Sequence, residues 1–297
     1  MGTRTYSRRA ADGTRVLTAL GRRRAGIVGQ DVDIFGDPIP DVNPPAPAPV
    51  TTEAANVLVL GKNRADWDSA MTRFKAIPLD RTLPNEQLVL LDDNYAVLSR
   101  EDGDRNSVSE ENVNPQVLQQ VKWLTHNHPD SVPLSTADLR NIMANGRSGI
   151  EARCNPITPA QRTTMNEYFQ SVRDDLVRTQ QTKLSKQARA NVDALMQVVD
   201  TFLTNPTATQ WTFIAHNSDS TPQFRNAGLM ENKVRKRITE LQNTGTVDAI
   251  LRASMLRAKT EKERRLVRTT YTILLQQAAL NMTLADYPAI THGIVFE

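Results

Sequence analysis

The chain of 297 residues is poor in cysteine, in aromatic side chains and in long apolar runs. Cys154 is its only cysteine, so no intramolecular disulfide can form and a reducing compartment is expected. No stretch of about 18 apolar residues occurs, so no segment is predicted to span a membrane. The first residues lack the apolar core of a signal peptide, and secretion by that route is not expected.

Charge is unevenly distributed along the chain. The net charge is +3, but residues 1–24 contain seven arginines and one acid, Asp12, which gives this segment a local charge of +6. Such an arm could bind nucleic acid or an acidic surface, or it could be a solvated tail that becomes ordered only against a neighbour. The proline-rich residues 37–50 predict an extended linker. Residues 1–52 are therefore predicted to form a basic arm and linker outside the folded core.

Two of the four histidines, His126 and His128, stand two positions apart and are followed by Pro129. Alternate side chains of a strand share a face, so both imidazoles are expected to point the same way. Pro129 ends the strand because it has no N–H to donate. Ser135 then begins a predicted helix, with Asp138 in its first turn. Two ring nitrogens and a carboxylate oxygen supply three ligands and leave a fourth tetrahedral position, the arrangement of a catalytic zinc site.

A general base for such a site is predicted upstream, in a β-hairpin. Residues 86–91 are strand-like, residues 92–94 form a turn and residues 95–98 predict the second strand. Glu86 stands at the open end of this hairpin. Its carboxylate could take a proton from a water molecule whose pKa the metal lowers to about 7.

The combined pattern resembles the JAMM (MPN-domain) zinc metallopeptidases, and the residues that carry the resemblance are Glu86, His126, His128, Pro129, Ser135 and Asp138. The asparagine between the histidines is more similar to bacterial and phage members, such as those in phage head-morphogenesis proteins. The resemblance covers roughly residues 80–155. It implies an α/β fold, with a mixed sheet flanked by helices. It also implies that His126, His128 and Asp138 hold zinc, that Glu86 activates water and that Ser135 donates to the developing oxyanion.

Other interpretations of the same residues stay open. Ser135 and Asp138 also fit a capping box, which explains both without a metal but gives no reason for the paired histidines. Glu86 could be an ordinary carboxylate at a strand end, and the whole site could be a degenerate copy in a scaffold domain. His216 and His292 are solitary, and each is predicted to be a surface or internally hydrogen-bonded histidine.

The remaining segments complete a three-part organisation. Residues 53–157 are predicted to form the JAMM-like core and residues 158–297 a mainly helical region for assembly or partner binding. In the core we expect a strand at 57–61, a helix at 65–74 and a strand at 149–153. In the helical region, apolar spacings of three and four predict helix from Pro159 to about Leu203, a short strand at 211–214, and helical segments at 229–241 and 247–282.

Two classes of function follow. The first is a phage-associated, zinc-dependent peptidase or isopeptidase that acts on a protein or peptide substrate, and the ligand set favours it. The second is a structural or assembly protein of a phage particle, such as a minor capsid protein, that uses the JAMM fold as a scaffold module. The basic arm, the linker and the long helices favour this second class, with other subunits as partners and nucleic acid as a candidate partner of the arm. Both classes predict a location in the cytoplasm of a bacterial host or in the virion.

Overall fold

The computed structural model describes residues 7–9, 15–17, 76–105, 107–243 and 246–297. The rest of the basic arm and linker, and the strand and helix expected at 57–61 and 65–74, lie outside the described residues. Within the arm, β1 (Ser7–Arg9) and β2 (Arg15–Leu17) pair as antiparallel strands.

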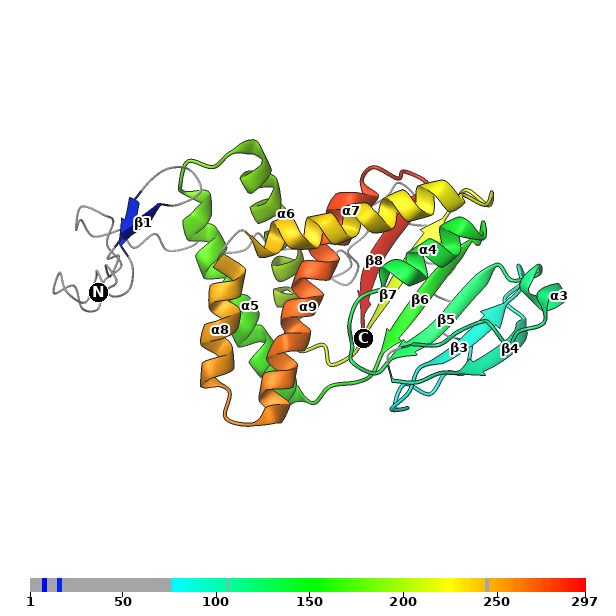
Figure 1. Cartoon of the computed structure of the whole chain (residues 1–297). Coiled ribbons are helices and arrows are strands. Elements are labelled where there is room, and N and C mark those ends of the chain that lie inside the picture. The colour runs from blue at the N-terminus through cyan, green and yellow to red at the C-terminus, as the bar shows by residue number, and fades with distance from the viewer. Residues whose placement is uncertain (1–6, 10–14, 18–75, 106, 244–245) are drawn as a thin grey trace, which may run out of the picture.

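A six-stranded mixed sheet forms the centre of the fold, with strand order β4-β3-β5-β6-β7-β8 (Figure 1). Its strands are β3 (Gln87–Leu91), β4 (Val97–Asp102), β5 (Trp123–His128), β6 (Gly149–Cys154), β7 (Trp211–Asn217) and β8 (Ile290–Phe296). Only β5 and β6 run parallel, and every other neighbouring pair is antiparallel. The described part of the chain also contains seven helices: α3 (Pro115–Leu118), α4 (Thr136–Ala144), α5 (Pro159–Gln180), α6 (Lys186–Leu203), α7 (Phe224–Gln242), α8 (Thr246–Arg257) and α9 (Glu261–Leu284). The predicted α/β class is confirmed.

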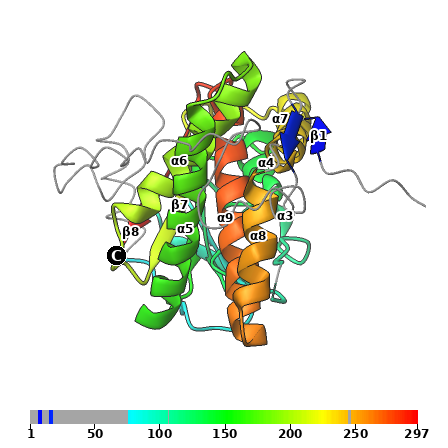
Figure 2. The same ribbon diagram turned by 90° about the vertical axis from the view of Figure 1, so that its left-hand side faces the viewer.

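The main hydrophobic core joins one face of the sheet to the helices. Alternation along β3 places Leu88 and Leu90 in this core, whereas Val89 and Leu91 belong to a smaller cluster on the opposite face. Helix α4 packs against β6, β7 and α7, and α9 packs against α5, α6, α7 and α8. Figure 2 shows α5, α6, α8 and α9 gathered in front of the sheet. None of the helices in the described ranges combines the length and apolarity needed to cross a membrane.

The structure corrects the predicted helical region in two ways. The continuous helix predicted from 159 to 203 is two helices, because the chain turns between α5 and α6 and Ser185 caps the second one. The two helices pack against each other through stacked Phe169 and Phe202, whose ring centroids lie 4.9 Å apart. The segment predicted at 247–282 is likewise divided, since Thr260 and Glu263 form a capping box that starts α9.

Two strands from the predicted helical region complete the central sheet. The short strand expected at 211–214 is the longer β7, which lies between β6 and β8. β8 was not predicted at all, and it pairs with β7 along its whole length from Ile290 to Phe296. Residues beyond 158 therefore contribute to the same sheet that contains the two predicted metal-binding histidines.

Candidate metal centre

Strand β5 directs both histidines toward the helix-covered face of the sheet. In the antiparallel pairing of β3 with β5, His126 lies opposite Leu88, which belongs to the main core. Directly opposite residues share a face, and His128 follows two positions later on that same face. Both side chains are buried, with exposed fractions of 2% for His126 and 4% for His128.

Helix α4 brings Asp138 to the histidines. Ser135 is the N-cap of this helix, and its hydroxyl oxygen accepts the Asp138 N–H at 3.1 Å. The Ser135 N–H in turn donates to Oδ2 of Asp138 at 2.6 Å, so the capping box is complete. The other carboxylate oxygen, Oδ1, lies 3.5 Å from Nε2 of His126. The capping box and the ligand role are therefore compatible, because the box fixes the carboxylate that faces the histidines.

Three potential ligand atoms converge in this way. The ligand atoms of His126, His128 and Asp138 all lie within 4.8 Å of one another, so the group could hold a metal ion. Oδ2 of Asp138 is 3.9 Å from Nε2 of His128, and the two Nε2 atoms are 2.8 Å apart. Two ligands of a tetrahedral zinc ion are separated by about 3.3 Å, so the two rings need to open by only about half an ångström to fit one.

The surroundings of the two rings favour metal-binding forms. Nδ1 of His128 lies 2.7 Å from the carbonyl oxygen of Val132. Since a carbonyl oxygen can only accept, Nδ1 of His128 carries a hydrogen, and this bond fixes the orientation of the ring, as in many metal-bound histidines. Burial lowers the pKa of His126 to about 4, against an opposing effect of the Asp138 carboxylate, and the His128 ring lowers it further. His126 is therefore a neutral imidazole at neutral pH, the form that binds metals.

Glu86 is held at the end of β3, on the same face as the histidines. Glu86 directly precedes Gln87, the first residue of β3, and by strand alternation it shares the face of Leu88, which pairs with His126. The Glu86 N–H donates to Asp104 at 2.7 Å, and its carbonyl accepts from Gly103 at 2.8 Å. These two bonds hold the backbone of Glu86 through both its N–H and its carbonyl group.

Burial and neighbouring carboxylates raise the pKa of Glu86 to about 8. Burial is the largest cause, followed by the negative charges of Asp138, Asp104 and Asp130. A strongly shifted carboxyl group beside a potential metal site is a candidate for proton transfer.

The structure thus brings His126, His128, Asp138 and Ser135 together, and Glu86 directly precedes β3, the strand that pairs with β5. Ser135 caps α4 as the alternative interpretation predicted, and its hydroxyl hydrogen has no acceptor in the described part of the chain. His216 and His292 stay apart from the cluster: His216 stacks on Trp123, and His292 is buried with Nε2 2.9 Å from Oδ1 of Asn281.

Sequence reasoning noted the asparagine between the two histidines but assigned it no structural role. Asn127 points away from the metal-binding face and is fully buried. Its Oδ1 accepts the Gln87 N–H at 2.6 Å, and its Nδ2 donates to the carbonyl of Asn85 at 2.9 Å. Asn127 therefore clamps the residues on either side of Glu86 to β5. An amide side chain between two strand histidines was the available signal, but its partners lie 40 and 42 positions away.

Helix α9 also supports the site, and the sequence did not indicate this. Gln276 donates from Nε2 to the carbonyl oxygen of Leu134 at 2.8 Å, directly before the N-cap of α4. Nearer the start of the helix, Arg265 donates to Oδ1 of Asp130 at 2.9 Å. Arg105 donates to the same oxygen at 2.7 Å, and together these bonds lower the pKa of Asp130. The loop that follows the histidines is thus tied to α9 at both ends.

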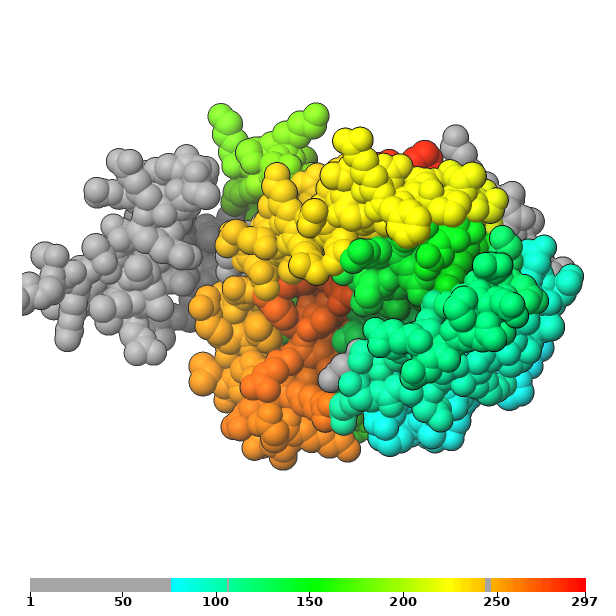
Figure 3. Space-filling model, turned by 45° about the vertical axis from the view of Figure 1, so that its right-hand side comes forward, coloured from blue at the N-terminus to red at the C-terminus, as the bar shows by residue number. Residues whose placement is uncertain are grey.

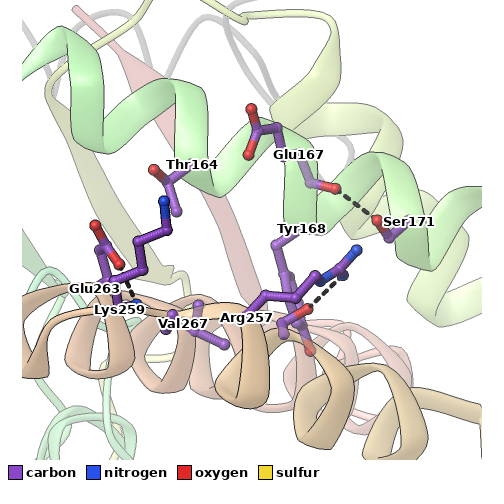
Figure 4. Close-up of a pocket in the computed structure, with 10 residues that line it drawn as sticks. Thr164, Glu167, Tyr168, Ser171, Arg257, Lys259, Glu263 and Val267 are labelled. Atoms are coloured by element: carbon purple, nitrogen blue, oxygen red, sulfur yellow. Dashed lines mark hydrogen bonds between the residues drawn. The ribbon is translucent and has the colours of Figure 1, made fainter.

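A separate cavity of about 320 Å³ lies between α5, α8 and α9 (Figure 4). Its polar groups are largely engaged with each other: Arg257 donates to Ser254, and the carboxylate of Glu263 accepts the Lys259 N–H. None of the residues predicted for the metal centre lines this cavity.

Comparison of the chain with protein-family models, with curated proteins and with solved structures finds no match. The resemblance to JAMM metallopeptidases stays a prediction that rests on the residues quoted for it.

Proposed function

We propose that this protein is a zinc-dependent hydrolase of peptide or isopeptide bonds, of the JAMM type, in which His126, His128 and Asp138 hold the ion. The observation that carries the proposal is the convergence of two buried ring nitrogens and one carboxylate within 4.8 Å, with Glu86 on the same face. Nitrogen and oxygen donors in this number suit zinc, and three protein ligands leave a position for substrate or water. When bound, zinc supplies Lewis acidity, which polarises a carbonyl group and makes water more acidic.

Glu86 is the proposed general base. With a pKa of about 8 it is mainly protonated at neutral pH in the metal-free protein. Glu86 becomes ionised when a divalent cation is present, because a nearby positive charge favours the carboxylate. Its carboxylate then takes a proton from the attacking water and passes a proton to the leaving amine, so that one amide bond and one water give a carboxylic acid and an amine.

Ser135 and Asp138 have different roles in the proposed reaction. The Ser135 hydroxyl still has its hydrogen available, since its oxygen acts as an acceptor for the Asp138 N–H. That hydrogen can donate to the carbonyl oxygen of a substrate as negative charge develops on it. Asp138 is oriented by the Ser135 N–H and presents Oδ1 to the centre of the site.

The substitution Glu86→Gln tests the catalytic part of the proposal. The variant should keep its zinc and its fold but lose hydrolysis of quenched peptide and isopeptide libraries, because an amide cannot accept the proton of water. Loss of zinc from this variant, or turnover equal to that of the wild-type protein, would remove Glu86 from the role of base.

The phage association and the location in a bacterial cytoplasm or a virion belong to the same proposal. The sequence features that support them are the Arg-rich arm, the proline-rich linker and the similarity to phage members of the family.

A further inference from the structure

A second cavity, of about 230 Å³, begins where the metal-binding strand ends. One wall is formed by Pro129, Asp130 and Ser131, the three residues that directly follow His128. The opposite wall includes Lys262 and Arg265 of α9. In the space-filling view, the orange surface of α8 and α9 lies beside the green and teal surface of the sheet and its loops (Figure 3). We refer to this space as the Asp130 cavity.

The rim of the Asp130 cavity is positively charged. Arg105, Lys262 and Arg265 are the basic residues that line it, and Asp130 is the only acid among the lining residues. Arg105 and Arg265 both donate to Oδ1 of Asp130, at 2.7 and 2.9 Å, so their guanidinium groups are directed at one carboxylate. Lys262 lies on the exposed side of α9 and has no ion-pair partner within the described ranges. The three basic side chains and the single Asp130 carboxylate leave a net positive charge at the rim, which can bind a second carboxylate.

The inner wall of the cavity is apolar. Met165 and Trp211 are buried, and Leu266 of α9 lies beside them. An apolar floor beneath a cationic rim suits a group that has a hydrocarbon portion and a carboxylate, such as a glutamate side chain or the last residue of a peptide.

We propose that the Asp130 cavity is a subsite for a carboxylate of the peptide substrate, close to the bond that is hydrolysed. Three of its lining residues, Pro129, Asp130 and Ser131, directly follow the proposed ligand His128, so the cavity lies beside the candidate metal centre. The assignment of the bond rests on the proposed function, whereas binding of the carboxylate does not require the metal. The carboxylate belongs either to an acidic side chain or to a free C-terminus.

Calorimetric titration of the full chain, stripped of metal with a chelator, tests the binding directly at low salt. One pair of amidated pentapeptides contains Glu or Gln next to a leucine, and a second pair without acidic side chains ends in a free carboxylate or in an amide. The acidic member of at least one pair should bind at least about threefold more tightly than its neutral partner. The pair that shows the difference identifies the source of the carboxylate. Equal binding within both pairs, or no binding of any peptide, would overturn the proposal.

Three variants make the test specific. Lys262→Gln should weaken the binding of the acidic peptide by about threefold and leave the binding of the neutral peptide unchanged. Lys259→Gln removes the same charge three positions away but lines the other cavity, so it should have no effect. Asp130→Asn removes the internal carboxylate that occupies the two arginines, and it should strengthen binding of the acidic peptide. Equal effects of the two lysine substitutions would contradict a specific subsite.

Zinc content of the wild-type protein is measured separately. Stoichiometric zinc without a carboxylate preference would reject the subsite and leave the proposed hydrolase intact. A carboxylate preference without zinc would reject the hydrolase and keep the binding site.

Discussion

Ser135 and Asp138 are joined by two reciprocal hydrogen bonds, and this pairing leaves one carboxylate oxygen of Asp138 directed at His126. The Ser135 N–H holds Oδ2 at 2.6 Å, while Oδ1 lies 3.5 Å from Nε2 of His126. The candidate metal ligand Asp138 is thus also the N3 residue of the capping box that Ser135 closes. Formation of the first turn of α4 therefore also positions the only acidic ligand in the group.

Ser135→Ala should lower both stability and zinc affinity. Loss of an N-cap hydroxyl costs about 1 kcal/mol of unfolding free energy, and loosening of a residue that orients a ligand costs about tenfold or more in metal affinity. Thr158→Ala is the matched control, because Thr158 closes an equivalent capping box with Gln161 at the start of α5. It should lose similar stability with unchanged zinc affinity. Denaturant unfolding measures the stability, and competition with a zinc chelator measures the zinc affinity. Equal zinc affinity in the two variants would show that the Ser135 cap does not position Asp138 for the metal.

Arg162 should be essential for the packing of α5 against the end of α6. It is 1% exposed, and its Nη2 donates to the carbonyl oxygens of Phe202 and Asn205 at 2.7 and 2.8 Å. Burial lowers its pKa to about 10, so the guanidinium stays charged at neutral pH. Arg162→Met leaves these carbonyls without their donor and should cost about 3 kcal/mol of unfolding free energy. Arg189→Met, at an exposed position of α6, should change stability by less than about 0.5 kcal/mol. Similar unfolding midpoints for the two variants would contradict this role.

His292 should make the metal-free protein less stable in mild acid. Burial holds its folded-state pKa at about 4, below the ordinary value of 6.5. Between these two values the unfolded chain binds a proton that the folded chain does not, so stability is lost as the pH falls from 6.5 toward 4. The loss is at most about 3 kcal/mol. His292→Gln keeps a donor for Asn281 and should flatten the stability curve in this window. Parallel curves for the wild-type protein and the variant, measured by denaturant unfolding, would show that His292 does not titrate in this way.

Local patterns in the sequence were sufficient to predict that His126, His128 and Asp138 lie together. The alternation of side chains in a strand predicted that His126 and His128 share a face, and the spacing from Ser135 to Asp138 predicted a helix cap. Both features depend on neighbours within four positions. The hairpin that carries Glu86 was predicted for the same reason, although its second strand begins at Val97 and runs to Asp102.

Long-range contacts explain what the sequence could not predict. The Asn127 clamp and the bonds of Arg265 to Asp130 join residues 40 to 135 positions apart, and no local pattern specifies such partners. β8 was missed because its residues follow a long helix and are recognisable as a strand only beside β7. The breaks between α5 and α6 and between α8 and α9 were missed because apolar spacing continues across the turns, and only the caps at Ser185 and Thr260 mark them.

The most direct test of the central claim is the zinc content of protein purified without a chelator. Elemental analysis should find close to one zinc ion per chain in the wild-type protein. His126→Ala, His128→Ala and Asp138→Asn should each lose it, whereas His216→Ala, which removes a histidine outside the cluster, should retain it. Wild-type protein without stoichiometric metal, or full zinc content in the His126→Ala and His128→Ala variants, would contradict the assignment of this metal centre.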